Sequence, residues 1–219
     1  MPYKAIVLDW DGTVVLSLDL KVENAAELFA RRFGVAPDAV RGSYRRHSGI
    51  PRRELFERIS EDCLGRGLGE AESAALSDAF TEANLRAIAG AAPLRPNLRP
   101  AVEAIRARSC VVVVSSSACP EELQALAPAL GIATLFDELM GSRPGFSKGP
   151  EHVAHVRERY GVELDEIAAV GDEPRDMALF GAAGVAPIGI TGTCDRAELC
   201  AGGASRVIND LIELLPDVG

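Results

Sequence analysis

The first apolar run of the chain, Ala5-Ile6-Val7-Leu8, ends in the acidic segment Asp9-Trp10-Asp11-Gly12-Thr13. Four consecutive buried-type residues predict a central strand of a parallel sheet. Open α/β sheets bind their ligands at the carboxyl ends of the strands. Because side chains two residues apart in an extended segment point the same way, Asp9 and Asp11 could face one metal ion or one reacting group.

From residue 16 to residue 92 the pattern changes from a strand to helices. Apolar residues recur every three or four positions, which predicts four helices and no strand. The first helix would end before Gly34, a typical C-cap residue, and the second would begin near Pro37. The third and fourth would carry Phe56 and Phe80 on their buried faces.

After residue 93 apolar runs and helical segments alternate in the manner of βαβ units. The most strand-like run is Cys110-Val111-Val112-Val113-Val114, and further strands are predicted around residues 136–140, 167–170, 185–190 and 207–208. We therefore predict an α/β protein with a parallel-sheet core, residues 1–15 and 93–219, and an inserted helical domain, residues 16–92.

Composition narrows the possible partners. The chain has 219 residues, of which 47% are hydrophobic, and a formal net charge of −9. A negative surface argues against non-specific binding to nucleic acid or to an anionic membrane. The chain has 5 cysteines and no CxxC pair, which is typical of reduced thiols, so we expect a cytoplasmic protein. The first apolar run is too short for a signal peptide or a membrane span.

The helical insert carries a basic stretch, for which two interpretations stay open. A solvated helix face is the commoner one, and arginines that face an anionic substrate are the other. The stretch comprises Arg41, Arg45, Arg46, His47, Arg52, Arg53 and Arg58.

Three more polar groups follow predicted strands or open predicted helices. Ser115-Ser116-Ser117 ends the valine-rich strand, Lys148 lies in a glycine-rich loop before a helix, and Gly171-Asp172 follows the strand at residues 167–170. If a helix begins there, Asp172 and Asp176 would lie one turn apart on one face. Each group also has an ordinary explanation: serines form turns, loop lysines are solvated, and aspartates cap helices.

The acidic segment at Asp9 likewise has alternatives. Paired aspartates can form a solvated turn or cap a helix. A calcium-binding EF-hand does not fit, because the loop would need Gly at its sixth position and Glu at its twelfth. Here Gly12 is fourth and Leu20 is twelfth.

Taken together, these motifs resemble those of the haloacid dehalogenase superfamily of hydrolases. The resemblance rests on Asp-x-Asp-Gly-Thr after the first strand, Ser115, Lys148 and Gly-Asp-x-x-x-Asp after a later strand, in this order. It covers nearly the whole chain, and the layout is similar to the phosphoglycolate phosphatase and β-phosphoglucomutase branch. The core would then be Rossmann-like, and the insert would be the α-helical cap of that branch.

The resemblance implies a Mg²⁺-dependent phosphatase that hydrolyses a small organic phosphate monoester through an aspartyl-phosphate. Asp9 would be the nucleophile, and Asp11 would protonate the leaving oxygen and then activate water. The implied site has further members. Asp9, the Asp11 carbonyl and Asp172 would bind the metal; Trp10 (through its backbone N–H), Ser115, Ser116 and Lys148 would bind phosphate; Asp176 and Glu173 would support the metal ligands; and Arg52, or less favourably Arg53, would hold a distal anionic group of the substrate.

Two rival functions remain at this point. A sugar-phosphate mutase would use the same residues, and a binding module could keep the fold without turnover. Asp11 favours C–O–P chemistry, because dehalogenase and phosphonatase members lack an acid at that position. The partner would be a small phosphorylated metabolite. Trp10 and Leu16 depart from the usual residues of the family, and we expect His152 and His155 to lie on a surface helix.

Overall fold

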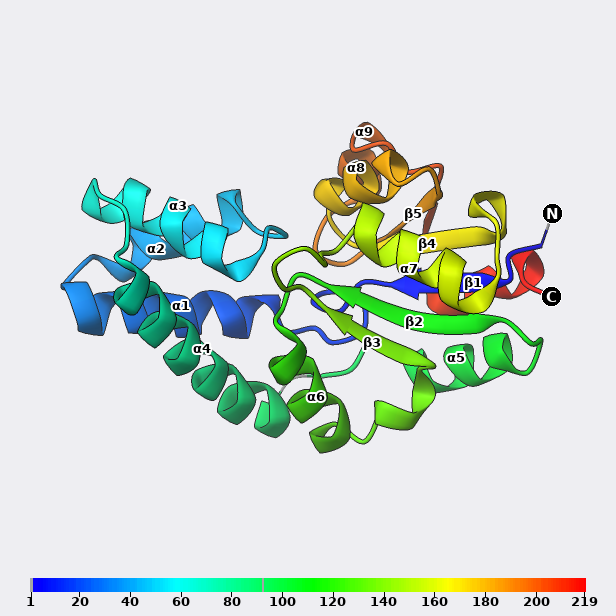
Figure 1. Ribbon diagram of the computed structural model, residues 1–219, viewed down its shortest axis with the longest axis horizontal. Helices are drawn as coiled ribbons and strands as arrows, with labels where there is room; N and C mark the ends of the chain where they lie inside the picture. The colour runs from blue at the N-terminus through cyan, green and yellow to red at the C-terminus, as the bar shows by residue number, and fades with distance from the viewer. Residues whose placement is uncertain (1, 92) are drawn as a thin grey trace. The chain divides into compact units, whose positions relative to one another are not determined.

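The computed structural model describes residues 2–91 and 93–219. Met1 and Ala92, which stand at the ends of the predicted core and of the predicted insert, lie outside the described residues. The chain divides into two compact units, Met1–Leu16 with Pro93–Gly219 and Ser17–Ala92. The first unit contains the sheet, and the second consists of helices α1 to α4 (Figure 1).

The first unit is built on a six-stranded parallel sheet with the order β3-β2-β1-β4-β5-β6. The strands are β1 (Ala5–Leu8), β2 (Val111–Ser116), β3 (Glu138–Gly141), β4 (Ile167–Gly171), β5 (Ala186–Ile190) and β6 (Arg206–Ile208). This confirms the predicted α/β fold with a parallel sheet. The first strand is central because β1 is apolar at every position and is buried on both faces.

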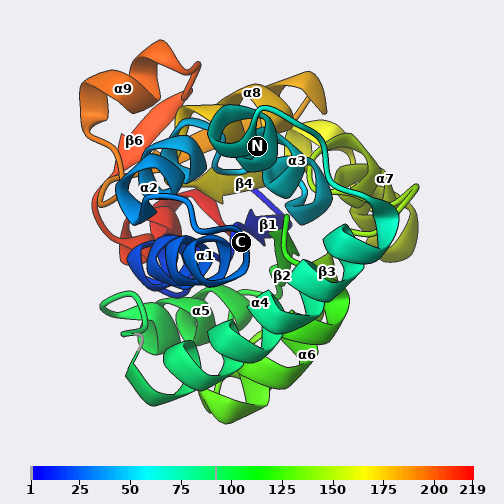
Figure 2. The same cartoon turned by 90° about the vertical axis from the view of Figure 1, so that its left-hand side faces the viewer.

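Helices cover both faces of this sheet. Helices α7 (Pro150–Tyr160) and α8 (Pro174–Ala182) lie on one face, where Val153 and Phe180 pack with Val7 and Val113. Helices α5 (Leu98–Arg106) and α6 (Pro120–Ala129) lie on the opposite face, as Figures 1 and 2 show. Helix α9 (Arg196–Ala201) packs on β5 and β6, and short 3₁₀ turns occupy Ala133–Leu135, Leu164–Glu166 and Leu211–Asp217.

The strand register fixes which side chains meet at the carboxyl edge of the sheet. Leu8 of β1 pairs with Val114 of β2 on one side and with Val170 of β4 on the other. The next residues, Asp9, Ser115 and Gly171, therefore emerge side by side. The Asp9 backbone N–H donates to the Val170 carbonyl at 2.9 Å, which extends the pairing by one residue.

The second unit contains the four predicted helices, α1 (Leu18–Phe33), α2 (Pro37–Arg46), α3 (Arg52–Leu64) and α4 (Glu70–Ala91). Three phenylalanine rings pack together in its core: Phe56 lies 5.7 Å from Phe29 and 5.2 Å from Phe80 between ring centroids. Gly34 ends α1 with a φ of 70°, the left-handed conformation expected of a C-cap glycine. None of the helices in the described ranges is long and apolar enough to cross a membrane.

Much of the basic stretch in this unit is engaged in ion pairs along the helix surfaces. Arg41 pairs with Glu23 at 2.8 Å and Arg46 pairs with Asp62 at 2.7 Å. Arg45 reaches Asp19 at 2.9 Å. For these three arginines the contacts are those of a solvated, salt-bridged helix face.

Candidate active site

Three buried carboxylates converge at the carboxyl edge of the sheet. Oxygen atoms of Asp9, Asp172 and Asp176 all lie within 4.8 Å of one another. Asp9 follows β1, Asp172 follows β4, and Asp176 lies in the first turn of α8. We call these three residues the acidic cluster.

A buried ammonium group lies between two members of the acidic cluster. Nζ of Lys148 donates to Oδ1 of Asp9 at 2.6 Å and to Oδ1 of Asp176 at 2.5 Å. The Lys148 side chain is only 4% exposed. Lys148 lies in the loop before α7. The next residue, Gly149, has a φ of 103°, a backbone conformation that residues other than glycine rarely adopt.

Burial and mutual repulsion raise the pKa of two members of the acidic cluster, Asp9 and Asp172. Burial raises the pKa of Asp9 well above its ordinary value; Lys148 opposes this shift, and Asp176 and Asp172 add to it. Burial, with repulsion by Asp176, raises the pKa of Asp172 to about 6. Burial alone would lower the pKa of Lys148, but the charges of Asp176 and Asp9 outweigh it and raise the pKa. The ammonium therefore stays charged, and a further cation would favour the ionised forms of Asp9 and Asp172.

Asp172 is held in place by hydroxyl groups from two loops. Thr13 Oγ1 donates to Asp172 Oδ1 at 2.9 Å, and a hydrogen bond from Thr193 helps to keep Asp172 ionised. Gly12 makes this approach possible: its φ is +82°, and a Cβ atom there would overlap the Asp172 carboxylate. The Asp-Gly-Thr segment thus supplies both the space for Asp172 and one of its hydrogen bonds.

Asp176 is positioned by the start of its own helix. Its Oδ2 accepts from the backbone N–H groups of Asp172 at 3.1 Å and of Glu173 at 3.2 Å. Helix α8 begins at Pro174, so Asp172 precedes the helix. The condition under which the sequence placed Asp172 and Asp176 one turn apart on one face, a helix that begins at Asp172, is therefore not met. Residue 171 is a glycine, and a Cβ atom at this position would overlap the side chain of Asp176.

The chemistry of the acidic cluster fits a divalent cation. Three carboxylates and one ammonium leave two negative charges when all are ionised. Carboxylate oxygen is the ligand type that hard cations such as Mg²⁺ prefer. A cation there would oppose the effects of burial and mutual repulsion that raise the pKa of Asp9 and Asp172.

The remaining predicted site residues of the core unit differ in their burial and in their hydrogen bonds. Ser115 is fully buried, and its hydroxyl lies 2.8 Å from Nδ1 of His152. Ser116 Oγ instead accepts from the Ala118 N–H at 3.0 Å, so this hydroxyl caps a turn. The Trp10 side chain is fully buried, and its indole N–H has no hydrogen-bond partner in residues 2–91 and 93–219. Asp11 is half-buried in the tight turn that follows β1.

Arg52, the predicted substrate residue of the helical unit, is anchored on α4. Its Nη1 donates to Thr81 Oγ1 at 2.6 Å, and its guanidinium lies 5.0 Å from the centroid of the Phe80 ring. Arg52 is half-buried, whereas Arg53 is exposed. The two neighbouring arginines thus differ in environment, and only Arg52 has its guanidinium over an aromatic face.

Arg95 is a site residue that the sequence did not reveal. Its guanidinium is buried and donates to backbone carbonyls of two loops: Thr13 at 2.8 Å and Thr191 at 3.0 Å, with Gly12 as a third acceptor. These loops carry Thr13 and Thr193, the two residues that hydrogen bond to Asp172. Arg95 therefore fixes the loops that hold Asp172. Carbonyl acceptors leave no signature in a sequence, so no pattern could have marked this arginine.

We expect Arg95→Met to destabilise the protein by about 2 kcal/mol or more, because it leaves buried carbonyls without a donor. Thermal or urea unfolding, followed by circular dichroism, would measure this loss. The matched control is Arg86→Met on the exposed face of α4, where Arg86 pairs with the exposed Glu82. Equal stability of the two variants would contradict the role of Arg95.

His152 corrects an expectation from the sequence. We expected His152 and His155 on a surface helix, but the His152 side chain is fully buried against the sheet. His155, three residues on, is partly exposed and contacts Glu138 at 3.0 Å. The reason is the face of α7: His152 shares it with Val153 and Val156, which pack in the core. His152 is thus a core histidine beside Ser115.

The burial of His152 predicts a loss of stability in acid. Burial lowers the pKa of His152 to about 4 from 6.5; Lys148 acts in the same direction, and Glu151 opposes it. Between these values the unfolded chain binds more protons than the folded one. The contribution of His152 to stability is therefore complete above pH 6.5 and is lost as the pH falls towards 4. Urea unfolding from pH 7 to pH 4 should show a steeper loss for wild type than for His152→Leu; parallel curves would refute this.

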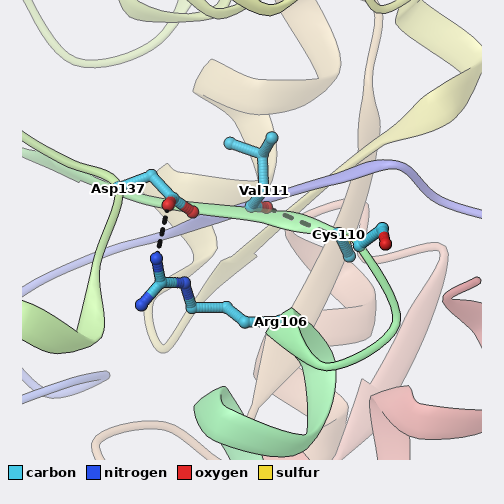
Figure 3. Close-up of a pocket in the computed structure, with 5 residues that line it drawn as sticks. Arg106, Cys110, Val111 and Asp137 are labelled. Carbon is cyan, nitrogen blue, oxygen red and sulfur yellow. Dashed lines mark hydrogen bonds and ion pairs between the residues drawn. The ribbon is translucent and has the colours of Figure 1, made fainter.

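A hollow in the core unit lies away from the acidic cluster. Arg106, Ser109, Cys110, Val111 and Asp137 line it around the start of β2 (Figure 3), whereas the cluster follows the carboxyl ends of β1 and β4. Arg106 pairs with Asp137 at 2.7 Å, and Asp137 also accepts from the Val112 N–H at 2.8 Å. The charged groups of this hollow thus bind each other.

Known proteins resemble the chain along most of its length. A family model described as haloacid dehalogenase-like hydrolase matches residues 3–184. A phosphoglycolate phosphatase of Haemophilus influenzae is 27% identical over 195 residues, 86% of each chain. The crystal structure of a predicted phosphoglycolate phosphatase from Haemophilus somnus superposes with a TM-score of 0.82 at 23% identity, over 98% of this chain and 97% of that one. A Bacteroides vulgatus protein provisionally named a β-phosphoglucomutase superposes with a TM-score of 0.81 at 19% identity, over 98% and 89%.

Proposed function

The chain belongs to the haloacid dehalogenase-like hydrolases, and from this premise we propose that it is a Mg²⁺-dependent phosphatase of a small phosphate monoester. The observation that carries the proposal is the Lys148 ammonium held between Asp9 and Asp176, beside Asp172. Such a site can neutralise an anionic phosphate while keeping a carboxylate close enough to attack it. The names of the relatives make phosphoglycolate the first substrate to test.

In this proposal Asp9 attacks the phosphorus atom and forms an aspartyl-phosphate. Asp11 gives its proton to the departing alcohol oxygen and then takes one from the water that hydrolyses the acyl phosphate. Lys148 and Ser115 bind the other phosphate oxygens, together with the backbone N–H of Trp10 and the turn at Ser116. The step requires an ionised Asp9, and Lys148, 2.6 Å away, favours that form.

Asp9, Asp172 and the Asp11 carbonyl would hold Mg²⁺, which when bound neutralises charge on the phosphoryl oxygens. Asp176 would support this set through its hydrogen bonds with the Asp172 and Glu173 N–H groups. Glu173 would assist from the same turn. The cytoplasmic location inferred from the cysteine content stays a prediction.

Phosphate release from a panel of esters tests this function. The panel comprises phosphoglycolate, sugar phosphates, nucleotides and pyrophosphate, each with Mg²⁺ and with a chelator. We expect release from at least one ester that depends on Mg²⁺. Isomerisation of a sugar phosphate, seen only with a bisphosphate activator, would replace the phosphatase by a mutase. Binding of Mg²⁺ and orthophosphate without turnover of any ester would instead indicate a module that does not catalyse.

We also propose that the helical unit is a cap that selects the substrate through Arg52. The guanidinium of Arg52 lies over the Phe80 ring and donates to Thr81, so the cation is preorganised. We expect Arg52→Met to raise KM about tenfold with little change in kcat, the pattern of lost substrate binding. Steady-state kinetics on the best ester would measure it, with Arg53→Met as the exposed control. Equal KM values for the two variants would remove Arg52 from the substrate site.

A further inference from the structure

His152 contacts the proposed phosphate site through a hydrogen bond with Ser115. Its Nδ1 lies 2.8 Å from Oγ of Ser115, and both side chains are fully buried. The two residues come from different elements, β2 and α7, and are 37 positions apart. The Phe146 ring packs on the imidazole with 4.4 Å between ring centroids, so the ring of His152 is fixed by packing.

The imidazole is neutral at neutral pH, so only one of its nitrogens carries a proton. Burial lowers the pKa of His152 to about 4, although the charge of Glu151 and the nearby Gly141 backbone oppose the shift. The proton can reside on Nδ1 or on Nε2, and the two forms have opposite effects on Ser115. With the proton on Nε2, the Ser115 hydroxyl must donate to Nδ1. With the proton on Nδ1, the ring donates to Oγ of Ser115.

The surroundings of Nε2 decide between these forms. Nε2 of His152 is buried and has no hydrogen-bond partner anywhere in the described part of the chain, residues 2–91 and 93–219. An N–H group buried without an acceptor carries a desolvation penalty, and buried N–H groups without partners are rare. A proton on Nδ1 avoids that penalty because Ser115 accepts it.

We propose that His152 is a positioning residue whose Nδ1–H donates to Ser115 Oγ and so directs the Ser115 hydroxyl hydrogen toward the substrate phosphate. This inference rests on the proposed function, because it needs a phosphate oxygen as the acceptor of that hydrogen. A hydroxyl oxygen that already accepts one hydrogen bond keeps its own hydrogen for another partner. The hydrogen bond from the ring therefore leaves the Ser115 hydroxyl hydrogen free to be donated to the phosphate.

Nitrogen-15 NMR of histidine-labelled protein tests the tautomer without any turnover. The chain has only 3 histidines, so the His152 signals are identified by their loss in His152→Asn. We expect the pattern of a neutral ring with a protonated Nδ1. A neutral ring with a protonated Nε2 would overturn the inference even if the protein is an active phosphatase. If no ester is hydrolysed, the proposed function fails and the tautomer can still be read.

Two substitutions then separate positioning from packing. In His152→Asn the side-chain amide nitrogen can stand where Nδ1 stands and donate to Ser115, whereas His152→Leu fills the space without a donor. We expect kcat/KM to fall about tenfold in His152→Leu, the value of one hydrogen bond, and to be largely retained in His152→Asn. When His152→Leu is added to Ser115→Ala, kcat/KM should fall no further than in Ser115→Ala alone. Orthophosphate binding measured by calorimetry should follow the same order. His152 would have a packing role only if kcat/KM fell equally in His152→Leu and His152→Asn. The same conclusion would follow if His152→Leu still lowered kcat/KM tenfold when added to Ser115→Ala.

Discussion

Asp9→Asn is expected to lower phosphatase turnover by roughly 10⁴-fold or more, the scale at which enzymes lose activity when their nucleophile is removed. The amide has nearly the same shape but cannot form an acyl phosphate. The variant should nevertheless fold. Asp9 is buried and its pKa is raised by that burial, so removing the charge also removes a desolvation cost, and Lys148 keeps Asp176 at 2.5 Å.

Phosphate release and thermal unfolding, measured on the same preparation, would check both parts of this prediction. The melting temperature should equal or exceed that of wild type. A control is Asp137→Asn at the hollow near the start of β2, which should keep wild-type turnover because it lies at the other end of the strands. An Asp9→Asn protein with full activity would eliminate Asp9 as the nucleophile.

Lys148→Met is expected to reduce stability as well as activity, because it removes the buried ammonium that pairs with Asp9 and Asp176. Breaking a buried ion pair by removing one partner costs about 3 kcal/mol or more. The pH dependence should change as well. Lys148 lowers the pKa of Asp9, so its removal takes the pKa of Asp9 in the folded protein further above the ordinary value of 3.8. Above pH 3.8 the Asp9 carboxyl of the folded variant then holds its proton more tightly than the same carboxyl in the unfolded chain. The variant should therefore gain stability, relative to wild type, as the pH falls from neutral.

Urea unfolding of wild type and Lys148→Met at pH 7 and pH 5 would measure this loss and its sign. Lys4→Met is the matched control. Lys4 also pairs with a carboxylate, Glu166 at 2.6 Å, but its side chain is 59% exposed. Lys4→Met should therefore lose little stability, and that loss should depend less on pH than the loss in Lys148→Met. If Lys148→Met were no less stable than Lys4→Met, the buried ammonium would have no structural role.

The fold was predictable from the sequence because its signals are local. The apolar run of β1, the valine-rich β2 and the helix-ending Gly34 each fix an element without help from distant residues. Strand ends in a parallel sheet meet at one edge, so the convergence of Asp9 with Asp172 followed from the order of the motifs. The sequence placed Asp172 and Asp176 one turn apart on one face only if a helix began at Asp172, and α8 begins two residues later, at Pro174.

The residues that hold the site in place were not predictable, because their partners are distant in sequence. Arg95 binds the carbonyl of Thr13, 82 positions away. His152 meets Ser115 only after α7 packs against the sheet, and its three-residue spacing from His155 suggested a surface helix instead. Backbone acceptors and buried faces depend on the tertiary fold, and neither leaves a motif in one sequence.

The most direct test of the account is to trap the phosphoryl group on the protein. Wild type, mixed with its best ester and Mg²⁺, is quenched in acid within a single turnover and reduced with borohydride, which converts an aspartyl-phosphate to homoserine. Peptide mass spectrometry should then find the change at Asp9 alone and none in Asp9→Asn. Phosphate released without any modified aspartate, or a modification at another residue, would contradict the nucleophilic role of Asp9.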